Sequence, residues 1–349
     1  MTAGPILIWG AGAIGGTVGA YLRRSGHEIV FVDVDVDHVA AINRTGLAIE
    51  GPIDNFSVTG RAFLPDEVTG RFERIFLCVK AHHTPAAIAA VAPHLAPDGY
   101  VLSLQNGLNE LVIAEAVGAE RTIGAFVNFG ADYLAPGRIH FGGRGAFVLG
   151  ELDGAPTPRL DSLAGLIRTE FEPGAIMTPN IWGYLWGKLG YGALLFATAL
   201  TDASIVDVLD AAPYRPLLSA LGEEVTAITD AVGVAPEGFN GFEPKAFRPD
   251  ADPAARDLSF AAMVAHNRRS AKSHSGIWRD LAVRKRKTEV DAQLGPIVDA
   301  ATRLGRQVPI TATLIALIHD IEDGRRPLAW STLDLLADRV GHARSEESA

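Results

Sequence analysis

The feature that most constrains the fold is a glycine pattern near the N-terminus. Gly10, Gly12 and Gly15 stand in G-x-G-x-x-G order within the stretch LIWGAGAIGGTVGAYLRRSGHEIVFVDVD, which begins at Leu7. The pattern follows a predicted strand, opens a predicted helix and lies in a strand–helix–strand unit of about 30 residues, which is the usual context of a dinucleotide-binding turn. The sequence therefore predicts a parallel sheet that carries such a turn.

Each glycine has a separate predicted role in this turn. Gly10 permits the sharp bend, Gly12 lets the backbone approach a pyrophosphate, and Gly15 lets the helix pack closely on the strand. Ala13 and Ile14 open the helix, where free N–H groups and the helix dipole favour an anion. The alternative is a tight strand-to-helix turn that binds no ligand.

The end of the second predicted strand bears on which dinucleotide would bind. Asp33 lies 18 residues beyond Gly15, near the position of the acidic residue that hydrogen-bonds the ribose 2′-hydroxyl of NAD. A carboxylate there also repels the 2′-phosphate of NADP. Asp35 and Asp37 follow at alternate positions, and we interpret them as helix-entry residues, with a cofactor contact as the alternative.

The rest of the chain predicts an α/β protein of two domains. Short β-branched runs alternate with helical segments to about residue 150, which favours a Rossmann-type doubly wound parallel sheet, and the stretch GRIHFGGRGAFVLGELDG resembles an antiparallel hairpin at its edge. Helical spacing of apolar residues dominates after residue 180, interrupted by a predicted loop at 237–257. The predicted divisions are a dinucleotide-binding domain at 1–178, a helical substrate and dimerisation domain at 179–340, and a flexible tail at 341–349.

Composition excludes several classes of function. The net charge of −10 disfavours a nucleic-acid partner, and the basic stretch at 279–289 is better explained as a solvated helix face or an anion contact. The N-terminus lacks the pattern of a signal peptide, and no apolar run reaches the roughly 18 residues of a membrane span, so we expect a cytoplasmic protein with no membrane partner. Cys78, the single cysteine, excludes an intrachain disulfide and is expected to be buried. The scattered histidines predict no metal site.

Several short motifs, in this order and spacing, resemble the ketopantoate reductase (2-dehydropantoate 2-reductase) family. They are the glycine-rich start, VKAHHTPAA and LSLQNGLNE after successive strands, WGKL at the start of a long helix, and KTEVDAQLG in a late helix. The resemblance extends from about residue 5 to about residue 325. It implies a nicotinamide-dependent oxidoreductase that interconverts a 2-oxo acid and a 2-hydroxy acid, with a small carboxylate or alcohol as substrate.

The resemblance also implies the site residues. Lys188 matches the family's lysine that acts on the substrate carbonyl, and an ammonium group suits that task because it stabilises the developing negative charge and can donate a proton. Glu289 matches the acidic residue that positions the lysine and the substrate. Lys80 and Asn106 match positions beside the cofactor, and Asn106 also has catalytic potential. The alternatives are a snorkelling Lys188 and a surface Glu289 paired with Lys285 or Arg286.

Three departures from the family pattern concern the substrate and the cofactor. The family's asparagines one and two turns after the lysine are replaced by Gly192 and Phe196, which predicts a reshaped, less polar pocket. The position of the substrate-binding serine is ambiguous among Ser273, Ser275 and Gly276, and Ser275 with His274, Trp278 and Arg279 forms an alternative anion-binding and stacking set. The family typically uses NADPH with an arginine after the second strand, whereas Val34 follows Asp33 here, so we predict NAD(H) over NADP(H).

Two further interpretations therefore stay open. The chain can be an NAD-dependent dehydrogenase of a different hydroxy acid, a sugar acid or a bulkier alcohol, or a non-catalytic NAD-binding sensor. The presence of both Lys188 and Glu289 argues against the sensor. The sequence leaves the oligomeric state open, although an apolar helical second domain favours a homodimer.

Overall fold

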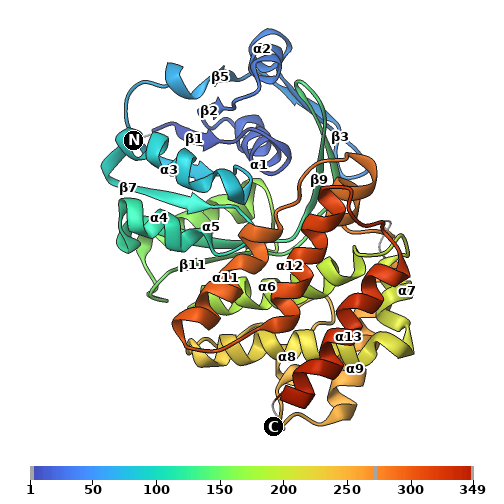
Figure 1. The fold of residues 1–349 in the computed structure, drawn as a ribbon. Coiled ribbons are helices and arrows are strands. Elements are labelled where there is room, and N and C mark those ends of the chain that lie inside the picture. The colour runs from blue at the N-terminus through green and yellow to red at the C-terminus, as the bar shows by residue number, and fades with distance from the viewer. Residues whose placement is uncertain (1–3, 270–272, 347–349) are drawn as a thin grey trace. The chain divides into compact units, whose positions relative to one another are not determined.

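The computed structural model describes residues 4–269 and 273–346, and the chain divides into two compact units, Met1–Ile181 and Trp182–Ala349 (Figure 1). The sequence placed this boundary after residue 178. The reason for the shift is Ile181, because a Cβ added to Gly124 or Gly150 would come within 2.8 Å or 2.7 Å of its side chain. Ile181 therefore packs directly on the sheet of the first unit.

The first unit is built on an eight-stranded sheet in the order β12-β11-β8-β7-β6-β1-β2-β5 among its described residues. The run from β8 to β5 is parallel, β11 joins β8 in antiparallel pairing, and β12 pairs with β11 in parallel. The strands are β1 (Ile6–Trp9), β2 (Ile29–Val32), β5 (Arg61–Phe63), β6 (Phe72–Leu77), β7 (Leu95–Ser103), β8 (Thr122–Val127), β11 (Phe147–Glu151) and β12 (Ile176–Met177). This order and direction confirm the predicted doubly wound sheet.

Residues on alternate positions of β1 enter two different cores, as expected for a strand buried on both faces. Ile6 and Ile8 pack in one core, while Leu7 and Trp9 pack in the other. Helices therefore cover both faces of the sheet. They are α1 (Ala13–Arg24), α2 (Val36–Thr45), α3 (Thr84–Val91), α4 (Asn109–Val117) and α5 (Pro158–Glu170).

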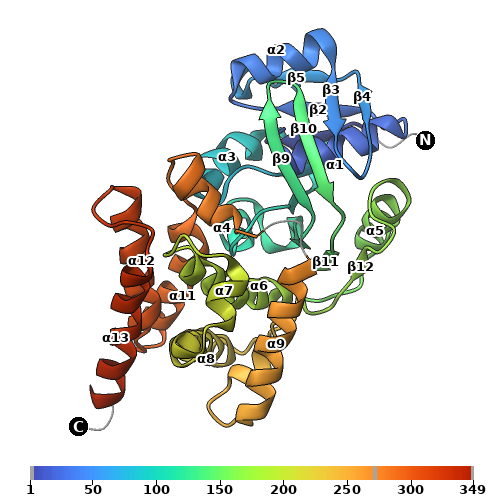
Figure 2. The same ribbon diagram turned by 90° about the vertical axis from the view of Figure 1, so that its right-hand side faces the viewer.

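A second, smaller sheet packs on the side of α1 that faces away from the main sheet. Its order is β4-β3-β10-β9, formed by β3 (Leu47–Glu50), β4 (Phe56–Val58), β9 (Gly130–Ala135) and β10 (Arg138–Gly143). Helix α1 contacts β1 and β2 on one side and all four strands of the smaller sheet on the other, an arrangement visible in Figure 2. The helix that follows the glycine turn is therefore packed between two sheets.

The predicted hairpin at the end of the first domain was wrong. β10 pairs with β9 in antiparallel fashion and with β3 in parallel, whereas β11 belongs to the main sheet. The hairpin turn lies instead at Gly137, whose φ of +74° suits a glycine. Between β10 and β11 the chain crosses from one sheet to the other, and Gly145 lies so close to the Asn128 carbonyl that a Cβ there would clash.

The second unit is helical. Its helices are α6 (Ile181–Thr198), α7 (Ile205–Asp210), α8 (Arg215–Ala231), α9 (Pro253–Arg269), α10 (Gly276–Trp278), α11 (Val290–Arg303), α12 (Pro309–Glu322) and α13 (Trp330–Glu346). Helix α8 contacts α7, α11, α12 and α13 and forms the centre of this unit. None of the helices in the described ranges is long and apolar enough to cross a membrane.

Two predicted irregular segments have more structure than expected. The predicted loop at 237–257 contains a short 3₁₀ helix, Pro244–Phe247, and Phe247 is fully buried against Gly222 of α8 and Phe260 of α9. The predicted tail at 341–349 continues α13 as far as Glu346, and residues 347–349 lie outside the described part of the chain.

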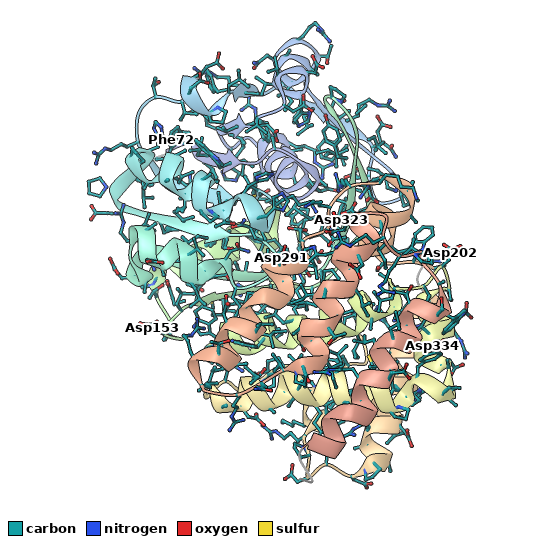
Figure 3. All side chains as sticks on the ribbon, in the orientation of Figure 1. Phe72, Asp153, Asp202, Asp291, Asp323 and Asp334 are labelled. Carbon is teal, nitrogen blue, oxygen red and sulfur yellow. The ribbon has the colours of Figure 1, made fainter. Side chains whose placement is uncertain are left out.

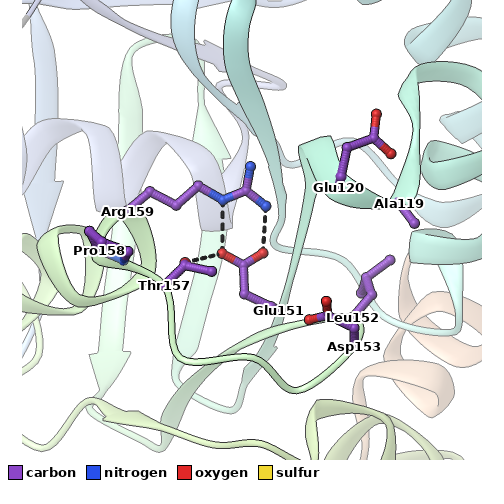
Figure 4. Close-up of a pocket in the computed structure, with 8 residues that line it drawn as sticks. All are labelled: Ala119, Glu120, Glu151, Leu152, Asp153, Thr157, Pro158 and Arg159. Atoms are coloured by element: carbon purple, nitrogen blue, oxygen red, sulfur yellow. Dashed lines mark hydrogen bonds and ion pairs between the residues drawn. The ribbon is translucent and has the colours of Figure 1, made fainter.

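A surface hollow in the first unit is lined by residues that hydrogen-bond to one another. Figure 4 shows the residues that line it: Ala119, Glu120, Glu151, Leu152, Asp153, Thr157, Pro158 and Arg159. Glu151, 3 % exposed at the end of β11, accepts bonds from Arg159 Nε at 2.8 Å and Nη2 at 2.5 Å, and a third from the Thr157 hydroxyl. Thr157 also caps α5, so the cluster fixes that helix to the sheet.

We predict that Arg159→Ala destabilises the first unit by about 3 kcal/mol, because it leaves a buried carboxylate without its cation. The matched control is Arg138→Ala. Arg138 also binds a carboxylate through two bonds, to Glu50, but that pair lies in solvent, where such contacts contribute little. The measurement is thermal unfolding of both variants. Equal losses of stability would contradict the structural role of the buried pair.

Candidate functional site

The glycine turn joins β1 to α1 with almost no spare space. Gly10 has a φ of +98°, and a Cβ there would lie 2.8 Å from the Val79 nitrogen. A Cβ at Gly15 would lie 2.2 Å from the Gly10 carbonyl oxygen and 2.8 Å from the Cys78 Cβ. Gly12 differs, since a Cβ there would meet no atom within 4 Å. Two glycines are therefore required by the protein itself, and the third borders open space.

The open space at Gly12 lies at the start of α1. Gly12 occupies the N-cap position without a side-chain cap, and Ala13 and Ile14 follow as the first helical residues. The N–H groups of a first helical turn have no partner within the helix, and they attract anions. A cradle that a Cβ would fill, next to these donors, fits the pyrophosphate of a dinucleotide.

His38 supports this turn, and the sequence analysis did not identify it. Its ring is fully buried, Nδ1 accepts the Gly137 N–H at 2.9 Å, and Nε2 lies 2.9 Å from the Ala11 carbonyl oxygen. Because Nδ1 is an acceptor, the proton lies on Nε2, which donates to Ala11. The only signal in the sequence is that His38 shares the apolar face of α2 with Ala41 and Ile42.

Asp33 and Asp35, which follow β2, make different hydrogen bonds. Asp35 caps α2 by accepting the N–H groups of Asp37 and His38, and it also accepts the Tyr133 hydroxyl at 3.0 Å. Partial burial opposes its ionisation, but these hydrogen bonds hold the pKa of Asp35 below its ordinary value. The expectation that Asp35 is a helix-entry residue is confirmed. Asp33 lies partly exposed at the strand end, with one oxygen accepting the Asp35 N–H at 3.1 Å.

Lys80 and Asn106 follow β6 and β7, whose carboxyl ends lie at one edge of the parallel sheet. A buried chain of hydrogen bonds connects the two segments. Gln105 Nε2 donates to the Val79 carbonyl at 2.9 Å and to Thr84 Oγ1 at 2.7 Å, and Thr84 donates to Asn109 Oδ1 at 2.7 Å. Asn109 in turn donates to the Asn106 carbonyl.

This chain of bonds fixes the backbone at Asn106, whose side chain stays partly exposed. Thr84 and Asn109 were missed by the sequence analysis, because a threonine and an asparagine near helix starts are explained equally well by capping. Cys78, beside this edge, is partly rather than fully buried, and desolvation raises the pKa of its thiol above the ordinary value, which disfavours the reactive thiolate.

In the second unit, Lys188 lies on α6, whose sequence IWGYLWGKLGYGALLFAT contains this single charged residue. The partly exposed positions toward the middle of the helix are Tyr184, Lys188, Gly192 and Leu195, which recur at helical spacing and form one stripe. Gly192 therefore lies one turn beyond Lys188 on the same face. Phe196 is fully buried, so its ring packs in the protein interior and contributes apolar volume.

Glu289 stands at the N-terminal end of α11, held by its two neighbours. Thr288 donates its N–H and its hydroxyl to Glu322 Oε1, both at 2.7 Å, and the Thr288 hydroxyl oxygen accepts the Val290 N–H at 3.2 Å. Glu322 is a nearly buried carboxylate on α12. This clamp fixes the backbone on both sides of Glu289, and nothing in the local sequence identifies its distant partner.

His319 completes the clamp on the side of α12. Its Nδ1 lies 2.9 Å from Glu322 Oε2, and its Nε2 lies 2.9 Å from Asp291 Oδ1, the residue labelled on α11 in Figure 3. Burial favours the neutral ring, but the hydrogen bonds and charges of Glu322 and Asp291 outweigh it and raise the pKa of His319. His319 therefore links α12 to the first turn of α11, and protonation of its ring strengthens this link.

The segment around Ser275 is organised by its own contacts. Ser275 caps α10 by accepting the Trp278 N–H, and the Trp278 indole donates to Asp202 at 3.1 Å. The His274 ring lies on the Trp278 ring, with centroids 4.0 Å apart, and its Nε2 contacts the Asp202 carbonyl. His274 and Trp278 are therefore engaged with Asp202. Arg279 follows directly and is partly exposed.

The basic stretch at 279–289 also has internal partners. Arg284 and Arg286 both bind Asp280, at 2.7 Å and 2.9 Å. Arg286, one of the two residues considered as a partner of Glu289, pairs with Asp280 in the structure. In the described ranges, no three histidine, cysteine or acidic side chains gather in a way that could hold a metal ion.

We predict that Gly12→Ala and Gly15→Ala fail for different reasons. Gly15→Ala forces a Cβ into the Gly10 carbonyl and should lower the melting temperature. Gly12→Ala meets no protein atom, so it should fold normally and weaken dinucleotide binding by roughly tenfold or more, since the methyl group occupies the approach to the pyrophosphate. Thermal unfolding and titration with NADH separate the two effects. Normal NADH affinity in Gly12→Ala would exclude this site.

We predict that His319 stabilises the second unit in a pH-dependent way. A group whose pKa is raised by folding contributes fully below its unfolded value of about 6.5 and loses this contribution as the pH rises through the folded value. His319→Gln should therefore lower the melting temperature by about 2 °C at pH 6 and by less at pH 9. Asp291→Asn should reproduce part of this loss. A difference independent of pH would show that the imidazolium contributes nothing.

Two family models match the chain. The model described as "Ketopantoate reductase PanE/ApbA" matches residues 6–154, and "Ketopantoate reductase PanE/ApbA C terminal" matches residues 180–322. The 2-dehydropantoate 2-reductase of Pyrococcus abyssi is 28 % identical over 319 residues, which cover 91 % of this chain and 97 % of the relative. The enzyme of the same name from Streptococcus pyogenes serotype M1 is 24 % identical over 316 residues, covering 90 % and 96 %.

Solved structures agree with these matches. The PanE/ApbA family ketopantoate reductase from Ralstonia eutropha JMP134 superposes with a TM-score of 0.77 and 28 % identity, covering 92 % of this chain and 99 % of that chain. A D-mandelate dehydrogenase in complex with NADH and anilino(oxo)acetate shares the fold with a TM-score of 0.77 and 21 % identity, over the same shares of the two chains. The chain belongs to the ketopantoate reductase family of nicotinamide-dependent oxidoreductases.

Proposed function

We propose that this protein transfers a hydride reversibly between NAD(H) and a 2-oxo acid, whose reduced form is a 2-hydroxy acid. Lys188 is the acid/base, Glu289 positions the lysine and the substrate, and Asn106 contacts the cofactor or the substrate. The observation that carries the proposal is Lys188 itself. It is the single charged side chain of an apolar helix and lies on that helix's partly exposed stripe.

The chemistry required of Lys188 follows from the reaction. When bound, a reduced nicotinamide supplies the hydride. The Lys188 ammonium stabilises the negative charge that develops on the carbonyl oxygen, donates a proton to that oxygen and later regains a proton from solvent. In the direction of oxidation, the neutral amine accepts the hydroxyl proton. A single lysine thus serves both directions without another ionisable group at the carbonyl.

Glu289 is suited to a positioning role because its backbone is held on both sides. The bonds of Thr288 to Glu322 and of Val290 to Thr288 fix the start of α11, from which the Glu289 side chain projects. A carboxylate close to an ammonium favours the charged form of that ammonium. Glu289 would in this way keep Lys188 ready to donate a proton.

The preference for NAD(H) rests on Asp33. Asp35 is committed to capping α2 and to Tyr133, whereas Asp33 uses one oxygen for the Asp35 N–H and lies partly exposed at the end of β2. A carboxylate in this place suits the ribose hydroxyls of NAD and repels a 2′-phosphate. Lys80, which follows β6 at the same carboxyl edge of the sheet, would also hold the cofactor.

A second candidate for the substrate is a bulkier 2-oxo acid. The open space beside Gly192 supports this candidate, because a Cβ there would meet no atom closer than 3.8 Å. The D-mandelate dehydrogenase of the same fold binds NADH and anilino(oxo)acetate, so the fold itself admits an aryl-substituted compound of this class. Ser275 and Arg279 are the proposed groups for the substrate carboxylate.

A homodimer in the cytoplasm remains part of the proposal. The support comes from α13, where Trp330 and Leu335 expose 39 % and 41 % of their surface although both are large apolar side chains. Such residues on a helical surface suit a contact with a second copy.

The test is a panel of 2-oxo acids assayed with NADH and with NADPH, using wild type and Lys188→Ala. We expect turnover with a 2-oxo acid, a higher kcat/KM with NADH than with NADPH, and a fall in kcat of roughly a hundredfold or more in Lys188→Ala. The affinity for NADH, measured by titration, should not change. The matched control is Lys245→Ala, which removes an exposed lysine of the same unit.

Three outcomes would overturn separate parts of the proposal. A wild-type kcat in Lys188→Ala would remove the lysine from the mechanism. A higher kcat/KM with NADPH would remove the role given to Asp33. Binding of NADH without turnover of any 2-oxo acid would identify the protein as a nucleotide-binding sensor.

A further inference from the structure

We propose that the side-chain amide of Gln293 binds the substrate and determines specificity, by hydrogen-bonding a hydroxyl or amide on the substituent of a 2-oxo acid. The inference rests on the proposed function, since it concerns the substrate of that reaction. It is carried by the juxtaposition of Gln293 on α11 with Gly192 on α6, two helices of the same unit.

The first observation concerns the space at Gly192. This glycine lies one turn beyond Lys188 on the partly exposed stripe of α6. A Cβ at Gly192 would meet a single atom within 4 Å outside its own helix backbone and chain neighbours, the Oε1 of Gln293 at 3.8 Å. The space that a side chain would occupy is therefore open, and the atom that borders it belongs to an amide.

The second observation places Gln293 beside Glu289. The Gln293 N–H donates to the Glu289 carbonyl at 2.9 Å, so the two residues are one turn apart at the start of α11. Residues at this spacing project from one face of a helix. Gln293 therefore lies one helical turn after Glu289 on α11, just as Gly192 lies one helical turn after Lys188 on α6.

The third observation is that the protein does not use this amide. Neither Gln293 Nε2 nor Oε1 makes a hydrogen bond to any residue within 4–269 or 273–346, although the side chain is partly buried. Two other amides behave differently: Gln105 donates to Val79 and Thr84, and Asn267 donates to Tyr191 and Met263. Gln293 therefore keeps a free donor and a free acceptor beside the open space.

The chemistry of the amide defines the class of ligand. A carboxamide is neutral and both donates and accepts, so its best partners are neutral groups that do the same, namely a hydroxyl or another amide. The carboxylate and the carbonyl of a 2-oxo acid call for cationic groups instead. The amide is therefore the group that would bind the substituent on the carbonyl carbon. Because residue 192 has no side chain, this substituent can be larger than a methyl group.

The test uses two substrates that differ only in one hydroxyl, 2-dehydropantoate and 3,3-dimethyl-2-oxobutanoate. Gln293→Leu should raise the KM for 2-dehydropantoate roughly tenfold, the value of one neutral hydrogen bond. Its kcat, and the KM for 3,3-dimethyl-2-oxobutanoate, should stay close to wild type. Gln293→Met, which is closer in shape, serves if leucine disturbs the packing. Gln307→Leu, which removes an exposed glutamine of the same unit, is the matched control.

A rescue variant makes the test specific to the space between the two helices. Gly192→Asn in the Gln293→Leu background returns an amide to this space from the opposite helix, and it should recover part of the lost affinity for 2-dehydropantoate. A purely structural role of Gln293 predicts no recovery, because the new side chain restores none of the contacts of the old one.

The outcomes distinguish this inference from the proposed function. If wild type reduces both substrates and Gln293→Leu changes their KM values equally, the inference is wrong and the proposed function stands. If wild type reduces neither these two nor any other 2-oxo acid, the proposed function is wrong and the inference fails with it. A hydroxyl-specific loss that Gly192→Asn partly reverses supports both.

Discussion

The close approach of α1 to β1 is the contact on which the first unit depends. A Cβ at Gly15 would overlap the Gly10 carbonyl and crowd Cys78 and Ile8, so the helix reaches its place only because that position is glycine. From this place α1 also contacts the smaller sheet, and its first turn borders the open space at Gly12. One steric condition thus sets the packing of two sheets and the position of the predicted phosphate site.

The smaller sheet in turn supports the glycine turn. His38 links the Ala11 carbonyl to Gly137, the residue at the turn between β9 and β10, and Tyr133 of β9 donates to Asp35 at the start of α2. Strand β9 and the turn at Gly137 are therefore part of the support for the glycine turn. The hydrogen bonds that Asp35 accepts use both of its carboxylate oxygens, whereas Asp33 accepts the Asp35 N–H with one oxygen, and for this reason the proposed ribose contact falls to Asp33.

In the second unit, Lys188 and Glu289 are positioned by two different kinds of contact. Lys188 is presented by an apolar helix, whereas Glu322 and His319 of α12 bind the start of α11 on either side of Glu289. Charged groups that are partly buried need such partners, because desolvation is costly without them. The amide of Gln293 makes no such bond among the described residues, and this is the observation behind its proposed role toward a substrate.

The sequence by itself determined the features that depend on local chemistry. The glycine pattern, the alternation of strands and helices and the acidic strand end predicted the doubly wound sheet and the cap at Asp35, and the order of short motifs indicated the family, as the structure and the family matches confirm. The tertiary structure alone decided which strands pair, since β9, β10 and β11 carry similar local signals yet belong to two sheets. It also decided the bonds of His38 to Gly137, of Thr288 to Glu322 and the placement of Gln293 beside Gly192. These partners are far apart in the chain, and spacing in sequence carries no signal for contacts that only packing creates.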